Sequence, residues 1–133
     1  MIRQEMAKTA PNPPLDRVHL MRSYCRLSDA ELAMNNLANA RGQADLSLPF
    51  FDEFKVTSPS LVVLREIGFC YESLGKVNRR IAMDASFPSW ERDAAAAASH
   101  DWYTKSSGVW DEWRRRGAAT PESEAEERFL QTR

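Results

Sequence analysis

The sequence predicts an all-α protein, folded as a single compact bundle of five to seven helices around a long central helix at about residues 59–83. Three observations support this fold class. The chain has 133 residues, of which 43% are hydrophobic, and this length is enough to bury one ordinary domain core. No segment shows the two-residue alternation of a β-strand. Apolar residues recur at steps of four and three, the spacing of one helix face, at Val63, Ile67, Cys70, Leu74, Val77 and Ile81.

The chain divides into three predicted parts. Residues 1–13 contain prolines and no apolar periodicity, which predicts a flexible N-terminal arm. Residues 14–117 carry the helical patterns and form the predicted domain. Residues 118–133 predict a loosely attached C-terminal helix with acidic first turns, where the helix dipole favours negative charge. The residues placed to hold this helix against the body are Ala125, Phe129 and Leu130.

Two helices are predicted before residue 43. The first begins at Pro14 and ends near Arg26. Ser28 and Glu31 then form an S-x-x-E capping box, which predicts the start of a second helix at Ser28. Gly42 is a typical left-handed terminator for that helix.

The segment from Gln43 to Thr57 is less regular, because its apolar residues crowd around Pro49. A short helix at about residues 48–56, capped by Ser47, fits the pattern, and a packed loop is the alternative. In either case we expect its aromatic residues to fill part of the core.

The central helix has a clear predicted start. Ser58 is a plausible N-cap, and Pro59 suits the first helical position. Gly68 and Gly75 lie inside this helix, where each glycine costs roughly 0.5–1 kcal/mol relative to alanine. We therefore expect them to allow a close helix crossing in the core, with a groove for a partner as the alternative.

The C-terminal half is predicted to begin after a break at residues 84–89, because Pro88 disfavours helix in the residue before it. A helix then starts near Ser86 or Ser89 and runs through an alanine-rich stretch. Gly108 interrupts it, and a further helix continues until Gly117.

Composition narrows the class of protein. The net charge is −1 and the predicted pI is about 6.1, so the whole chain lacks the basic field of a typical nucleic-acid-binding domain. We see no secretory signal and no apolar run that spans a bilayer. We expect a cytoplasmic protein with reduced thiols, no cofactor, no membrane partner and no small-molecule substrate.

One candidate for catalysis is the dipeptide His100-Asp101, which resembles the metal-binding pair of HD phosphohydrolases. The other ligands would have to come from His19 and Asp111, which are only loosely available. A partly exposed histidine near the end of a helix is the favoured interpretation.

A second candidate is a thiol site built from Cys25, Cys70 and His19. A nucleophilic cysteine needs an electropositive, partly exposed setting. Cys70 lies in the apolar stripe of the central helix, and Cys25 lies near Met21 on the apolar side of the first helix, so burial is favoured for both. Together with the absence of glycine-rich phosphate loops and of HExxH or GxSxG motifs, these observations favour a non-catalytic protein.

The basic residues provide the remaining candidates. Asp111 and Glu112 precede Arg115 and Arg116 by four residues, which predicts local ion pairs within one helix. Arg79 has no acidic residue four positions before it. We therefore predict that a phosphate backbone would be contacted by a strip of Lys76, Arg79 and Arg80, joined by Arg22 and Arg26.

In size and helical character the chain resembles the small helical subunits of CRISPR effector complexes. This resemblance implies a non-catalytic subunit or adaptor of a larger assembly, with RNA or single-stranded DNA as alternative partners beside other protein subunits. The alternative function is a protein-binding regulator or inhibitor, for example one from a mobile element. Its contacts would come from tryptophan and arginine, which often anchor protein interfaces, and from the acidic C-terminal tail. The partner-interface residues are Trp110, Trp113 and Arg114.

Overall fold

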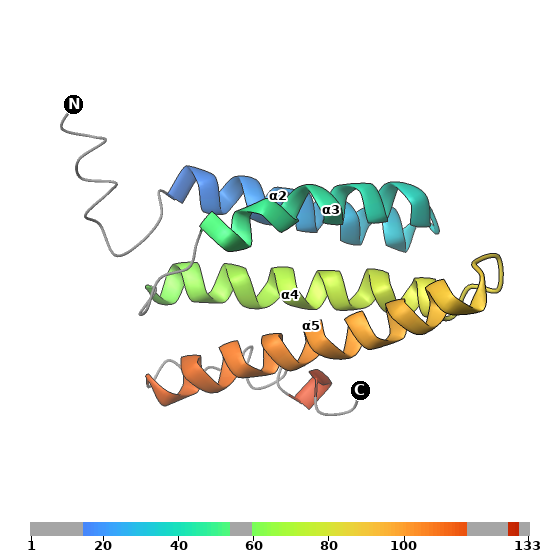
Figure 1. The fold of residues 1–133 in the computed structure, drawn as a ribbon. Helices are drawn as coiled ribbons and strands as arrows, with labels where there is room; N and C mark the ends of the chain where they lie inside the picture. Colours follow the sequence, from blue (N-terminus) through green and yellow to red (C-terminus); the bar gives the residue numbers. More distant parts are fainter. Residues whose placement is uncertain (1–14, 54–59, 117–127, 131–133) are drawn as a thin grey trace.

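The computed structural model describes residues 15–53, 60–116 and 128–130 (Figure 1). These residues form four helices and a helical turn at 128–130, and the described part of the chain contains no β-strand. The predicted all-α class is confirmed. The helices are α2 (Leu15–Ala33), α3 (Leu37–Glu53), α4 (Leu61–Ala82) and α5 (Ser89–Arg115).

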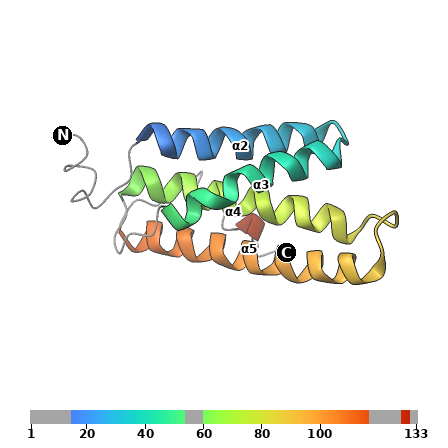
Figure 2. The same cartoon turned by 45° about the horizontal axis from the view of Figure 1, so that its top comes forward.

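The helices form two antiparallel hairpins, α2 with α3 and α4 with α5, and α4 lies between the first hairpin and α5 (Figures 1 and 2). Among the described helices, α4 alone has a backbone that approaches all three others. It is therefore the central helix that the sequence predicts, although α5 is longer, with 27 residues against 22.

The apolar stripe of α4 forms the core of the bundle. All six residues that define the stripe in the sequence are buried. The N-cap of α4 is Ser60, whose hydroxyl oxygen accepts a hydrogen bond from the Val63 amide at 3.3 Å. The predicted cap at Ser58 and the first-turn Pro59 lie outside the described residues.

The predicted helix start at Ser28 is wrong, because α2 continues through this residue to Ala33. The Ser28 side chain is fully buried, and its hydroxyl donates a hydrogen bond to the Ala40 carbonyl of α3 at 2.8 Å. This contact between helices satisfies the hydroxyl without a cap. The chain turns instead at Asn35, which has a φ of 60°, a left-handed conformation that asparagine tolerates better than most residues.

The predicted stop at Gly42 and start after Ser47 are also wrong, because α3 runs through both residues. Gly42 lies on an open side of the helix, where a Cβ would meet no atom within 4 Å. Ser47 donates a hydrogen bond back to the Ala44 carbonyl at 2.6 Å. Pro49 is accommodated inside the helix, close to its C-terminal end.

The break before α5 is confirmed, with Pro88 at the N-cap. The predicted interruption at Gly108 is wrong, since α5 is continuous through it. The crossing of α4 and α5 is as close as the glycines of α4 predict. A Cβ at Gly68 would lie 2.9 Å from Val109 Cγ1, and one at Gly75 would lie 2.9 Å from the Tyr103 ring.

Serines of α5 complete this crossing. Ser106 donates a hydrogen bond to the Gly68 carbonyl at 2.9 Å, and Ser99 donates one to the Gly75 carbonyl at 2.9 Å. The two pairs are seven residues apart on each helix, so they recur on the same antiparallel seam. The interpretation of Gly68 and Gly75 as a core crossing is confirmed.

Of the predicted C-terminal helix, only residues 128–130 are described, and they are helical. Leu130 is buried, and the Phe129 ring lies 6.4 Å from the Tyr103 ring, so these residues do contact the body as expected. The predicted arm at 1–13 and Ala125 lie outside the described residues. No helix in the described ranges is both long and apolar enough to cross a membrane.

Candidate functional surfaces

Both thiols are buried between α2 and α4. Cys25 and Cys70 are 0% exposed, and the two side chains lie within hydrogen-bonding reach of each other. Burial raises the pKa of the Cys70 thiol well above its usual value, and its hydrogen bond with Cys25 raises it further. The expected burial of both cysteines is confirmed, and neither sulfur is open to a substrate.

The residues considered for metal binding are not gathered into a site. His100 and Asp101 are exposed on α5, whereas His19 lies on α2, a helix whose backbone does not approach α5. Asp111 lies three helical turns further along α5 and forms an ion pair with Arg114. Within the described ranges, no group of three or more metal-binding side chains occurs.

Three residues of the predicted phosphate-binding strip have partners within the protein. Arg22 Nε lies 3.2 Å from Glu66 Oε2, and its guanidinium covers the Phe69 ring at 4.9 Å. Lys76 pairs with Glu72 at 3.3 Å, and Arg80 donates a hydrogen bond to the Asn35 side chain at 2.9 Å. Their role in binding nucleic acid stays a prediction, but the strip is not a row of unpaired charges.

Arg79 and Arg26 are the exposed members of the strip. Neither forms an ion pair with another residue of the described structure. Arg79 lies at a cleft between α4 and α5 that His100 also lines. The fold therefore brings together two residues that the sequence placed in separate hypotheses.

The predicted partner interface is rearranged by the fold. Trp110 is 1% exposed and packs edge-on against Phe69 and Trp113, with ring centroids 5.1 and 5.9 Å away. It is a core residue, because Gly68 lets α4 approach its indole ring. Trp113 is half-buried against the same core, and Arg114 is exposed.

All three arginines at the end of α5 have acidic partners in their own helix. Arg114 pairs with Asp111 at 2.8 Å, and Arg115 and Arg116 both pair with Glu112. The predicted pair of Glu112 with Arg116 is confirmed, at 2.9 Å. The predicted pair of Asp111 with Arg115 is wrong, because Arg115 pairs with Glu112 instead. The hydrogen bonds from Arg115 and Arg116 lower the pKa of the Glu112 carboxyl below its usual value, and the bond from Arg115 is the larger cause.

The three most exposed large apolar side chains lie at the opposite end of the bundle. Figures 1 and 2 show that this end carries the α2–α3 and α4–α5 turns. Met34 is 67% exposed, Met83 70% and Trp90 71%, the highest values among large apolar residues of the described structure. Met34 and Met83 lie in the two turns, and Trp90 lies in the first turn of α5. We call Met34, Met83 and Trp90 the apolar turn surface.

The backbone beneath this surface is held by polar contacts. The hydrogen bond from Arg80 to Asn35 ties the end of α4 to the α2–α3 turn. In the other turn, the Asp84 carboxylate accepts hydrogen bonds from the Ser86 hydroxyl and amide at 2.7 and 2.9 Å. These bonds lower the pKa of Asp84, the hydroxyl bond most strongly. A hollow of about 380 Å³ separates the two turns.

Sequence reasoning did not single out Trp90, and one signal could have done so. Trp90 follows Pro88 and Ser89 at the start of a helix, where no preceding turn of the same helix can cover its ring. Trp110 and Trp113 stand out in the sequence because a run of arginines follows them. That position does not determine whether their side chains are buried. Comparison with protein-family models, with curated proteins and with solved structures found no match to this chain.

Proposed function

We propose that this chain is a non-catalytic helical adaptor, a subunit of a larger assembly, which binds a partner protein through its apolar turn surface. The observation that carries the proposal is the clustering of its most exposed large apolar side chains at one end of the bundle. Tryptophan is among the residues that most often dominate binding energy at interfaces. Large apolar groups that gather on a protein surface are typical of interaction sites.

The setting of these side chains supports the same function. The hydrogen bonds at Asn35 and Asp84 hold both turns in place before a partner arrives. Binding then costs less conformational entropy than it would from two free loops. The partner that fits is a protein with an apolar pocket or groove for the Trp90 ring.

The nucleoprotein form of this hypothesis rests on fewer residues than the sequence predicts. Arg22, Lys76 and Arg80 are engaged inside the protein, which leaves Arg79 and Arg26 as the exposed cations of the strip. A backbone contact usually needs several phosphates neutralised at once. Docking on a protein is therefore the form that we propose.

The test is a quantitative pulldown with the tagged full chain from its native host, with and without nuclease. We expect one stoichiometric protein partner that survives nuclease treatment. Trp90→Ala should weaken its binding about thirtyfold, the effect of removing an interface hot spot. Thermal unfolding should be unchanged, because the ring is 71% exposed.

Val62→Ala is the matched control, since Val62 is also an exposed apolar residue but lies at the other end of the bundle. Its partner binding should equal that of the unmodified chain. Equal losses for the two variants, or no partner that depends on Trp90, would contradict the proposal. Release of the partner by nuclease would favour the nucleoprotein form.

A further inference from the structure

A second binding site is indicated by the cleft between α4 and α5. It has a volume of about 400 Å³, within the range of small-molecule sites. Arg79 lines it from α4, Met83 from the turn after α4, His100 and Ser107 from α5, and Leu130 from the C-terminal turn. Met83 belongs to the apolar turn surface as well, but Trp90 does not line the cleft. Ligand binding here can therefore be tested without the Trp90 ring.

The charge of this cleft differs from that of other hollows on the surface. The described residues that line it supply a guanidinium, an imidazole and several hydroxyls, and none of these residues carries a carboxylate. Asp101, next to His100 in sequence, does not line it. Among the described lining residues, no acid therefore competes with a bound anion for Arg79. Other hollows combine both signs, with Asp29 beside Lys76 and Arg80, Asp45 beside Arg41, and Asp84 beside Arg80.

The hydrogen bonds inside the cleft leave a defined set of donors. Ser99 donates its hydroxyl hydrogen to the Gly75 carbonyl, and Thr104 donates its own to the His100 carbonyl, both at 2.9 Å. Ser107 forms no hydrogen bond through its hydroxyl with any described residue. The donors for a ligand include the side chains of Arg79, His100 and Ser107.

These donors favour a phosphate group over a carboxylate. The donors come from two helices, so a ligand that binds all of them needs several acceptor atoms. A phosphate monoester offers three acceptor oxygens and carries a charge of about −1.5 to −2 near pH 7. An arginine guanidinium binds two such oxygens at once. The phosphate alone would leave the apolar part of the cleft empty. That part consists of Ala82, Met83, Ala96, Leu130 and the Tyr103 ring.

We propose that the α4–α5 cleft binds a small-molecule phosphate monoester. Arg79 and Ser107 hold the phosphate, His100 donates a further hydrogen bond, and the apolar wall covers the organic body. This ligand class is one that the sequence analysis did not predict, because Arg79 and His100 lie 21 residues apart in sequence. Only the antiparallel packing of α4 and α5 places both residues at one cleft.

The experiment is a titration of the full chain, followed by amide chemical shifts and calorimetry, with four matched probes at millimolar concentration. Phenyl phosphate should bind and shift resonances of α4 and α5 around the cleft. Phenol, benzoate and inorganic phosphate should each bind at least tenfold more weakly. Equal binding of benzoate would overturn the choice of phosphate. Equal binding of phenol would mean that the phosphate contributes nothing, and equal binding of inorganic phosphate would mean that the organic body contributes nothing. Either result would overturn a site that binds both parts of the ligand.

Variants then locate the site. Arg79→Gln should weaken phenyl phosphate binding about ten- to a hundredfold, the usual effect of losing a charge-assisted hydrogen bond. Ser107→Ala should weaken it less. Arg26→Gln is the matched control, because it removes an exposed arginine of α2 that does not line the cleft, and it should leave affinity unchanged.

Two further results would overturn the proposal. One is the absence of binding by both phenyl phosphate and AMP, which differ in the size of the organic body. The other is tighter, Arg79-dependent binding of a single-stranded RNA without a terminal phosphate, which would assign the cleft to a nucleic-acid backbone. Because Trp90 takes no part in either measurement, failure here leaves the pulldown test unaffected.

Discussion

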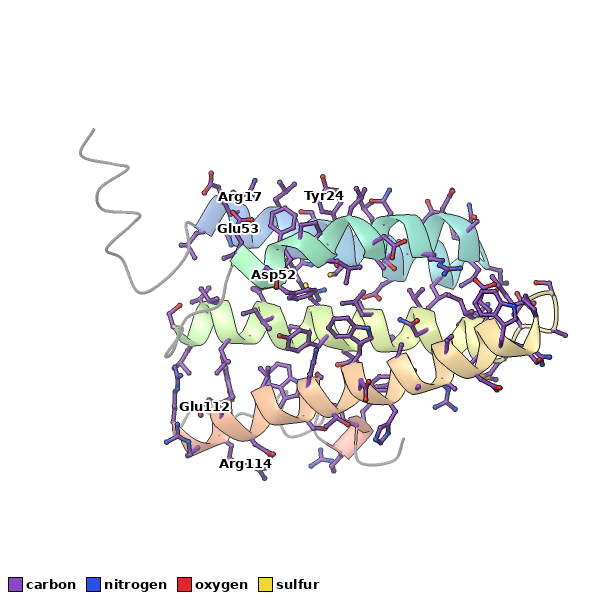
Figure 3. The ribbon with its side chains drawn as sticks, viewed as in Figure 1. Arg17, Tyr24, Asp52, Glu53, Glu112 and Arg114 are labelled. Carbon is purple, nitrogen blue, oxygen red and sulfur yellow. The ribbon has the colours of Figure 1, made fainter. Side chains whose placement is uncertain are left out.

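The two ends of the bundle present different kinds of surface. At the end where α2 begins and α5 stops, charged side chains are paired, with Arg17 and Glu53 at 2.7 Å and Arg114 and Asp111 at 2.8 Å (Figure 3). The turn end carries the three most exposed large apolar side chains, those of Met34, Met83 and Trp90. Exposed ion pairs contribute little to stability or to binding, whereas exposed apolar rings gain free energy when a partner covers them.

This difference shows that conspicuous residues are not always available ones. The run Arg114-Arg115-Arg116 is the most basic segment of the sequence, yet each guanidinium has an acidic partner in its own helix. Trp90 has no run of arginines beside it in sequence, and its side chain is 71% exposed. Substitutions at three sites test this comparison, from the largest expected effect to the smallest.

The charge-paired end contains one pair that is largely buried, and removing it should have the largest effect. Arg22 and Glu66 have side chains that are 15% and 10% exposed. Glu66→Ala should lower the free energy of unfolding by about 3 kcal/mol, because it leaves the Arg22 charge buried without its partner. Chemical denaturation measures this change.

The double variant Arg22→Met with Glu66→Leu separates charge from packing. It should recover most of the lost stability, since two apolar groups of similar volume replace the pair. Glu66→Ala could instead lower the free energy of unfolding only as much as the loss of an exposed ion pair does. The buried pair would then not distinguish this end of the bundle from the turn end. A double variant as unstable as Glu66→Ala would likewise contradict a charge effect.

At the turn end, Asn35 should give an intermediate effect. Asn35→Ala places a Cβ-bearing residue that lacks a side-chain amide at a φ of 60°, where the left-handed conformation costs roughly 1–2 kcal/mol. Asn35→Gly tolerates this φ and loses only the hydrogen bond from Arg80. Thermal unfolding should therefore rank the unmodified chain above Asn35→Gly and place Asn35→Ala last. Equal losses for the two variants would show that the side-chain bond, which both remove, sets the turn, and not the left-handed backbone.

The smallest effect is expected at Glu112, on the charge-paired end (Figure 3). Hydrogen bonds from Arg115 and Arg116 lower the pKa of its carboxyl. The stability that the ionised carboxylate contributes is therefore present above the usual glutamate pKa, and it is lost as pH falls through the lowered value. Glu112→Gln should lower the melting temperature slightly at neutral pH and leave it unchanged in acid. A difference that persists in acid would mean that the charge is not its cause.

Much of the fold could be predicted from local pattern. The stripe from Val63 to Ile81, the break at Pro88 and the close crossing at Gly68 and Gly75 all follow from residue type and spacing. That the helices continue through Ser28, Gly42 and Gly108 could not be predicted in this way, because cap and terminator signals are weak compared with tertiary contacts. The buried hydrogen bond from Ser28 to Ala40 is such a contact.

Of the candidate surfaces, only part could be predicted. Arg79 was correctly separated from the arginines with acidic neighbours, since pairing four residues apart along a helix is visible in sequence. The pairs of Arg22 with Glu66 and of Arg80 with Asn35 join different parts of the chain. Sequence spacing contains no information about such partners.

The sequence by itself determined the fold class, the central helix and the seam on which α5 packs, because these depend on periodicity and on side-chain volume along one segment. The tertiary structure decided which polar and aromatic residues remain exposed. Burial depends on the neighbouring helices, so Trp110 became part of the core while Trp90 stayed exposed. For the same reason, Arg79 and His100 came to share a cleft that neither helix forms alone.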